Sequence, residues 1–210
     1  MRISHKLTLF IIALLVIDQA VKIWIKTHMM IGQEFSVLGD WFKILFVENN
    51  GMAFGMEFGD GKWAKTALSI FRIVAIFGIG WYISKLIREK APLGVLFSFA
   101  LIFCGALGNI FDCLFYGIIF NGSYHQIATL FPPEGGYSSF LHGRVVDMLY
   151  FPLIEGRFPT WVPFWGGEDF LFFRPVFNLA DSYITIGVFI LILFYRNYFS
   201  DKKEEEIQQS

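Results

Sequence analysis

The sequence predicts a mainly α-helical membrane protein with four transmembrane helices, a small external β-rich subdomain and an extended external insertion. Composition is the first observation behind this prediction. Of the 210 residues, 55% are hydrophobic and 19% are aromatic, and the mean hydropathy is +0.55. A soluble domain of this composition would expose large apolar patches. The second observation is that four apolar segments each approach the ~20 residues that a membrane helix needs.

The four segments cover about residues 7–27, 64–87, 93–112 and 176–196. The first segment looks like a signal peptide, because basic residues precede its apolar core. However, no small-x-small cleavage site follows it, and Asp18 and Lys22 interrupt its far end. We therefore interpret the first segment as a membrane helix that is not cleaved off.

Basic residues flank the segments in a pattern that predicts their orientation. They precede the first segment, fill the short link between the second and third, and follow the fourth: Arg2, Lys6, Lys85, Arg88, Lys90, Arg196, Lys202 and Lys203. With four spans these positions share one side of the membrane, which should be the cytoplasmic side. Both termini would then be cytoplasmic. Residues 1–200 would form a single integral membrane domain, followed by a charged cytoplasmic tail at 201–210.

The two long connections, about 28–63 and 113–175, would lie outside. The first is predicted to be β-rich, because D-W-F-K-I-L-F-V-E-N is dominated by aromatic and β-branched residues and ends at the turn signal Asn50-Gly51. The second is longer and rich in glycine, proline and aromatic residues. Its Trp161 and Trp165 suit a membrane–water interface.

Several classes of function find no support in the sequence. A net charge of −1 provides no strong field for nucleic acid. Cys104 and Cys113 match no metal or redox spacing, and Cys104 lies in an apolar run where a thiol usually packs. His142 precedes Asp147 by five residues, but the chain has no H-E-x-x-H motif. We therefore predict no metal and no cofactor.

Polar residues gather at one predicted depth of the membrane. They fall late in the outward-running segments and early in the last inward-running one: Asp18, Lys22, Asn109, Asp112, Asn178 and Asp181. Ionisable groups are costly in a membrane and usually functional. Scattered polar residues would not agree in depth, so this convergence predicts a site in the outer part of the membrane.

Two aspartates are the candidates for chemistry at that site. Asp147 lies in G-R-V-V-D-M and Asp181 in F-N-L-A-D-S, and both are embedded in apolar residues. Two carboxylates brought to one place form an acid–base pair that shares a proton. The residues alone also fit a proton-coupled transporter, or an assembly factor that uses its polar groups for helix packing. The clustering of polar groups at one end disfavours a transport path.

The neighbouring motifs have structural interpretations as well. Asp18 and Lys22 are four residues apart and can pair on one helix face. Small residues at 105–108 would let helices approach closely, and Asn109 and Asp112 would then need polar partners. The stretch E-N-N-G-M-A-F-G, 48–55, predicts an ordinary hairpin, or else a loop in which Asn49 holds a peptide.

Five blocks occur in order: V-I-D-Q-A-V-K, E-N-N-G-M-A-F-G, G-A-L-G-N-I-F-D, G-R-V-V-D-M and F-N-L-A-D-S. With four spans, they resemble the bacterial lipoprotein signal peptidase (signal peptidase II) family. The resemblance implies an intramembrane aspartic endopeptidase of the bacterial cytoplasmic (inner) membrane, with its active site near the outer face. It implies diacylglyceryl-modified prolipoproteins as substrates, cut just before the lipid-modified cysteine, in contact with membrane lipid. It leaves the oligomeric state open, and a monomer is compatible with it.

The resemblance also assigns residues. Asp147 and Asp181 match the catalytic pair. Other motif positions are matched by supporting or substrate-binding residues, which are Asp18, Lys22, Asn49, Gly105, Asn109, Asp112 and Asn178.

The chain departs from the family pattern in two respects. Cys113 stands where the family usually has an arginine, and residues 118–142 and 152–175 look inserted. We hypothesise that Arg72 or Arg144 replaces the missing cation, with Arg72 pairing with Asp112 as a counter-ion. The insertions are expected to form an extra cap or an interfacial segment.

Overall fold

The computed structural model describes residues 2–49, 62–152, 154–157, 159–163, 165–172 and 175–199. The chain forms two compact units, one of residues 1–20, 61–111 and 179–210, and one of residues 21–60 and 112–178. The second unit nearly coincides with the two connections predicted to be external. The Asn50-Gly51 turn and the tail at 201–210 lie outside the described residues. The single domain over 1–200 stays a prediction.

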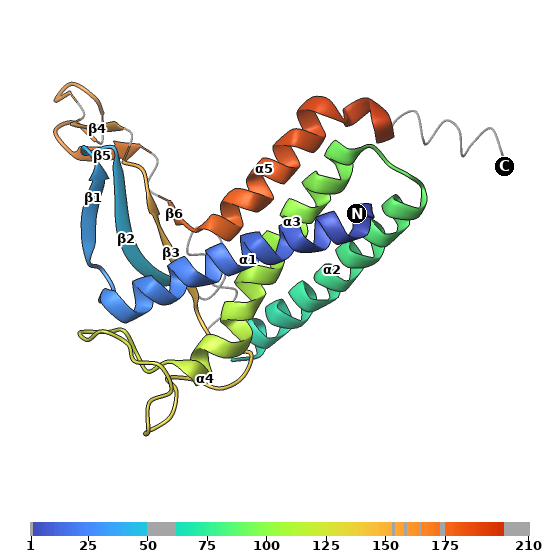
Figure 1. The fold of residues 1–210 in the computed structure, drawn as a ribbon. Coiled ribbons are helices and arrows are strands. Elements are labelled where there is room, and N and C mark those ends of the chain that lie inside the picture. The colour runs from blue at the N-terminus through green and yellow to red at the C-terminus, as the bar shows by residue number, and fades with distance from the viewer. Residues whose placement is uncertain are drawn as a thin grey trace. The chain divides into compact units, whose positions relative to one another are not determined.

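Four long helices account for the predicted apolar segments: α1 (Ile3–His28), α2 (Lys62–Arg88), α3 (Leu93–Phe111) and α5 (Leu179–Phe194), as Figure 1 shows. Three helical stretches, Ile3–His28, Lys65–Arg88 and Leu93–Ile119, are long and apolar enough to cross a membrane. The prediction of a mainly helical membrane protein is therefore confirmed. Helix α5 is apolar but has 16 residues, so the fourth span stays a prediction.

One predicted helix boundary was wrong. Val176 and Phe177 form a strand, β6 (Val176–Phe177), so α5 begins three residues later than expected. Their backbones pair with strand β3, and this pairing overrides the apolar run that suggested a helix. The predicted third segment, about 93–112, agrees with α3, which is followed directly by a π-helical turn η2 (Asp112–Tyr116) and the short α4 (Gly117–Ile119). Such π turns often mark functional positions.

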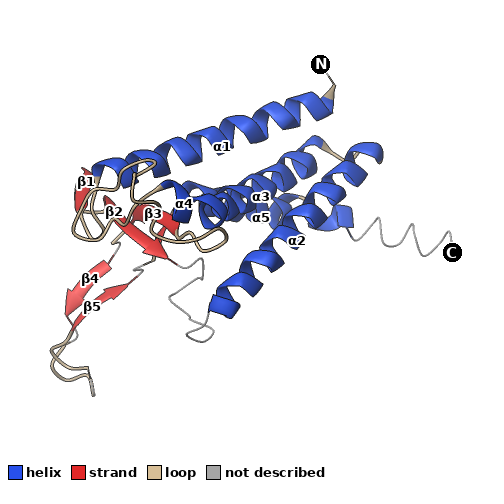
Figure 2. Ribbon diagram, turned by 90° about the horizontal axis from the view of Figure 1, so that it is seen from below, coloured by secondary structure: helices blue, strands red, loops and turns tan. Residues whose placement is uncertain are grey.

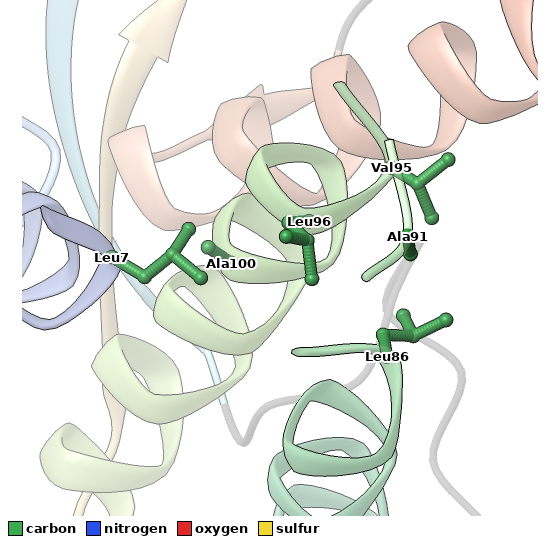
Figure 3. Packing of buried hydrophobic residues seen from close by; sticks show 6 residues of the cluster. All are labelled: Leu7, Leu86, Ala91, Val95, Leu96 and Ala100. Carbon is green, nitrogen blue, oxygen red and sulfur yellow. The ribbon is translucent and has the colours of Figure 1, made fainter. Parts of the chain in front are cut away.

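The core of the helical unit lies where α2 turns into α3. Six buried apolar side chains meet there, and Figure 3 shows them: Leu7, Leu86, Ala91, Val95, Leu96 and Ala100. They come from the start of α1, the end of α2, the link, and the first turns of α3. The link turns tightly, with Lys90 at a positive φ of 55°. This core joins three helices at one end of the unit.

Glycine allows α3 and α5 to pack closely. A Cβ added at Gly105 would lie 2.2 Å from the Ala180 carbonyl oxygen and 2.7 Å from Cγ1 of Ile184. From the α5 side, a Cβ at Gly187 would lie 2.6 Å from the Ser98 carbonyl oxygen. The predicted role of small residues in helix packing is confirmed at Gly105.

The second unit is built on an antiparallel sheet in the order β1-β2-β3-β6, with β1 (Glu34–Leu38), β2 (Phe42–Asn49) and β3 (Val145–Tyr150). Figure 2 shows the first three strands side by side. The predicted β-rich connection is thus confirmed over β2. Strands β4 (Ile154–Arg157) and β5 (Asp169–Phe172) form a separate hairpin inside the predicted insertion at 152–175.

The other predicted insertion, 118–142, folds back onto the chain that precedes it. Backbone N–H groups of Tyr137, Ser138 and Gly143 donate to the carbonyls of Phe120, Gly117 and Cys113, over 2.9, 2.8 and 2.8 Å. The segment is therefore tied to the π turn and α4. Because β3 begins directly after it, this anchoring also fixes where β3 starts.

The packing at Gly105 makes a testable prediction. Gly105→Ala should lower the free energy of unfolding by about 1–3 kcal/mol, because backbone atoms of α5 leave no space for the new methyl group. Gly78→Ala is the matched control, since nothing lies within 4 Å of its added Cβ. Thermal unfolding in detergent should show a lower midpoint for the first variant only. Equal midpoints would contradict the close packing of α3 and α5.

Candidate active site

The carboxylate of Asp147 is enclosed by side-chain amides. Asp147 is 3% exposed. Its Oδ1 accepts a hydrogen bond from Nδ2 of Asn178 over 2.6 Å, and its Oδ2 accepts one from Nδ2 of Asn49. A carboxylate removed from water needs such donors, because desolvation penalises its charged form. The two asparagines therefore allow an ionised Asp147 to stay buried.

The sheet explains why these three side chains meet. Val47 lies directly opposite Asp147, and Asn49 follows two residues later on the same face of β2. Such diagonal neighbours are within reach of polar side chains. Asn178 follows β6, whose residues pair with Leu149 and Tyr150 of β3. Pairing of β3 with strands on both sides thus delivers both amides to Asp147.

A buried ion pair lies next along the same strand. Nζ of Lys22 is 2.9 Å from Oδ2 of Asp112, and both side chains are fully buried. The same Oδ2 accepts a hydrogen bond from the backbone N–H of Val146 over 3.3 Å. Asp112 opens the π turn, so this contact links α1, the π turn and β3. Lys22, one of the predicted supporting residues, is thus the counter-ion of Asp112.

Asp181 lies in the helical unit, and its carboxylate is bound by the side-chain amide of another asparagine. Nδ2 of Asn109 donates to Oδ1 of Asp181 over 2.7 Å. Asp181 occupies the first turn of α5, where the helix dipole favours a negative charge. Asn109 and the first turn of α5 therefore hold the carboxylate of Asp181 in place.

Asp18 fixes the start of α5. Its Oδ1 accepts the backbone N–H of Ala180 over 3.0 Å, and its Oδ2 accepts Nε2 of Gln19 over 3.1 Å. A Cβ at Gly108 would lie 2.7 Å from Oδ2 of Asp18, so this glycine provides the space for the carboxylate. Asp18 thus orients the backbone near Asp181.

The structure groups the predicted site residues in two sets. One set is in the sheet unit: Lys22, Asn49, Asp112, Asp147 and Asn178. The other is in the helical unit: Asp18, Gly105, Asn109 and Asp181. The juxtaposition of Asp147 and Asp181 stays a prediction. So does the pairing of Arg72, which is half-buried on α2, with Asp112.

Sequence reasoning missed Lys26 and Glu48, which form a second buried ion pair. Lys26 was overlooked because a lysine near a helix end usually extends to the interface. The signal was its spacing: Asp18, Lys22 and Lys26 recur every four residues along one face of α1. Among the described residues, no three His, Cys, Asp or Glu side chains gather in a group that could hold a metal ion.

Comparison with known proteins decides the family. The profile described as "Signal peptidase (SPase) II" matches residues 10–196. The chain belongs to the signal peptidase II family. The resemblance inferred from the five sequence blocks is therefore confirmed, and with it membership of a family of bacterial membrane proteases.

Individual members agree with this assignment. The chain is 55% identical to the lipoprotein signal peptidase of Porphyromonas gingivalis over 88% of its length and 80% of the relative's. It is 41% identical to that of Amoebophilus asiaticus over 85% of its length and 72% of the relative's. A bacterial membrane enzyme solved in meso at 2.3 Å superposes with a TM-score of 0.63 at 25% identity, covering 96% of this chain and 94% of that one.

In this member of the signal peptidase II family, breaking the Lys22–Asp112 pair should destabilise the fold strongly. Lys22→Met leaves Asp112 buried without its cation and should lower the free energy of unfolding by ~3–5 kcal/mol. Adding Asp112→Leu should recover most of that loss, since no buried charge then remains. Lys85→Met, which breaks a half-exposed pair with Glu89, is the control and should cost less than ~1 kcal/mol. Equal losses for Lys22→Met and Lys85→Met would contradict the role of burial.

Proposed function

We propose that this protein removes signal peptides from diacylglyceryl-modified prolipoproteins, cutting just before the lipid-modified cysteine, with Asp147 and Asp181 activating water. Its relatives in Porphyromonas gingivalis and Amoebophilus asiaticus are named lipoprotein signal peptidases. The family membership supports the substrate class. The assignment of the chemistry to Asp147 and Asp181 is supported by the hydrogen bonds that their side chains accept.

The observation that carries the proposal is the enclosure of each aspartate by amide donors. Each carboxylate oxygen of Asp147 accepts a hydrogen bond from a side-chain amide, and Oδ1 of Asp181 accepts one from Nδ2 of Asn109. Chain connectivity supports their pairing. Asn178, which binds Asp147, and Asp181 are three residues apart, so their Cα atoms are separated by at most about 11 Å.

The proposed mechanism needs no metal and no nucleophilic side chain. Two adjacent carboxylates cannot both ionise easily, so the pair retains one proton. The ionised carboxylate removes a proton from water as the water oxygen attacks the scissile carbonyl carbon. The protonated carboxyl donates a hydrogen bond to the carbonyl oxygen as negative charge develops there. The carboxyl that gained the proton from water then donates a proton to the leaving nitrogen as the C–N bond breaks, and the pair again holds one proton. The pair titrates as a unit, so neither aspartate has a fixed role.

The two parts of the substrate suit the two parts of the protein. A diacylglyceryl group is apolar and fits the lipid-exposed surfaces of membrane helices. The peptide is polar and fits the sheet that carries Asn49 and Asp147. Binding energy from the lipid would then hold the scissile bond in position for attack.

Replacing either aspartate should test the chemistry directly. Asp147→Asn and Asp181→Asn should each abolish cleavage of a lipidated prolipoprotein by purified protein in detergent, because the pair loses its shared proton. Both variants should still insert and unfold near the wild-type temperature. Asp40→Asn changes an exposed aspartate in the turn between β1 and β2, and it should cleave normally.

Near-normal turnover in either dyad variant would refute the assignment. Loss of stability without a specific loss of turnover would instead favour an assembly factor. The wild-type protein should remain active in EDTA. Activity that EDTA removes and zinc restores would indicate a metalloprotease.

We also propose that both termini are cytoplasmic, with the site near the outer face of the bacterial cytoplasmic membrane. This follows from the basic flanks of the predicted spans. In a variant lacking Cys104 and Cys113, a cysteine at Ser138 should react with an impermeant reagent added to intact cells after the outer membrane is permeabilised. A cysteine at Ser210 should not react. The reverse pattern would invert the orientation.

A further inference from the structure

The site described above leaves one charged cluster without a function, a buried ion pair with a half-exposed arginine beside it. It consists of Lys26, Glu48, Ser123 and Arg144, all within the sheet unit. Lys26 is fully buried and the Glu48 side chain is 2% exposed. Burying two charges is costly, and apolar residues of similar size would often stabilise a fold equally well. The cluster therefore calls for an explanation other than stability.

Glu48 is the centre of this cluster. Its Oε1 accepts Nζ of Lys26 and, over 3.2 Å, Oγ of Ser123. Its Oε2 accepts Nη1 of Arg144 over 3.4 Å. The three donors come from α1, from the insertion at 118–142 and from the residue preceding β3. One carboxylate thus fixes the end of β2 to three separate parts of the unit.

Aromatic rings hold the cations around Glu48. Nζ of Lys26 lies 5.1 Å from the ring centres of Phe120 and Tyr137 and 5.8 Å from that of Phe46. The Arg144 guanidinium lies 5.6 Å from the Tyr137 ring, and the Arg144 backbone N–H donates to the Tyr137 hydroxyl over 2.7 Å. Burial raises the pKa of Tyr137, so the ring stays neutral beside both cations.

The register of β2 and β3 connects this cluster to Asp147. Glu48 lies directly opposite Val146, and it reaches Arg144 diagonally on one face of the sheet. Asn49 reaches Asp147 diagonally on the other face. A slip of one residue would exchange the two faces and place Glu48 beside Asp147. The ion cluster on one face therefore specifies the amide contact on the other.

We propose that Glu48 is a positioning residue for the reaction, acting through Asn49 to hold the carboxylate of Asp147. Its side chain contacts Lys26, Ser123 and Arg144, and it acts on Asp147 only through Asn49. The inference rests on the proposed function, because it requires Asp147 to be catalytic. It assigns a role to the charged cluster that stability alone does not explain.

A double-mutant cycle tests the proposal in the cleavage assay with lipidated prolipoprotein. Glu48→Gln should lower kcat several-fold, and Asn49→Ala should lower it about tenfold or more, with KM within about twofold. The variant carrying both changes should match Asn49→Ala alone, because Glu48 acts through that amide. Losses that multiply, or a wild-type kcat for Glu48→Gln, would overturn the proposal.

A second variant covers the case in which Glu48→Gln does not fold. Lys26→Met with Glu48→Met removes both buried charges, so it should fold while kcat falls about tenfold. Wild-type kcat in this variant would overturn the proposal. Glu34→Gln is the control, because Glu34 pairs with Lys43 over 3.3 Å on the same sheet but is 46% exposed. It should not change kcat.

The variant Asp147→Asn, measured in the same assay, distinguishes failure of the positioning role of Glu48 from failure of the proposed function. If Asp147→Asn is inactive and the Lys26→Met, Glu48→Met variant keeps the wild-type kcat, only the role of Glu48 is refuted. If Asp147→Asn cleaves normally, the proposed function itself fails, and this inference fails with it.

Discussion

The structure depends on keeping carboxylates buried in a chain that is mostly apolar. Asp147 is 3% exposed, and each of its oxygens accepts a side-chain amide. A carboxylate without such donors would be driven to its neutral form or out to water. The sheet meets this requirement, because Asn49 lies at the end of β2 and Asn178 directly follows β6. Strands β2, β3 and β6 therefore hold Asp147, one of the two proposed catalytic residues.

The same constraint explains the first helix. Lys22 and Lys26 are fully buried, four residues apart, and each meets a different acid, Asp112 in the π turn and Glu48 at the end of β2. Neither cation could stay buried alone, so each pair ties α1 to another element. Two costly ion pairs on one helix face are better explained by the positioning they provide than by the stability they add.

The sequence predicted the helices well, because long apolar runs with basic flanks have few alternatives. It also singled out Asp147 and Asp181 as candidates, because each conflicts with its apolar surroundings. It did not predict β3 as a strand. In V-V-D-M-L-Y, five of six residues are buried, so no alternation of apolar and polar residues is visible. The strand pairing of Val176 and the π turn at Asp112 depend on partners that are distant in the sequence. The role of Glu48 was not predicted, because its motif resembles an ordinary hairpin.

The central claim is that two carboxylates act together while sharing one proton. The pH dependence of kcat/KM for the wild-type protein, measured on a lipidated prolipoprotein in detergent, tests it most directly. The account predicts a bell-shaped profile, with an acidic limb where the base becomes protonated and a basic limb where the shared proton is lost. A rate that rises with pH to a plateau, with no basic limb up to the pH at which the protein unfolds, would contradict it.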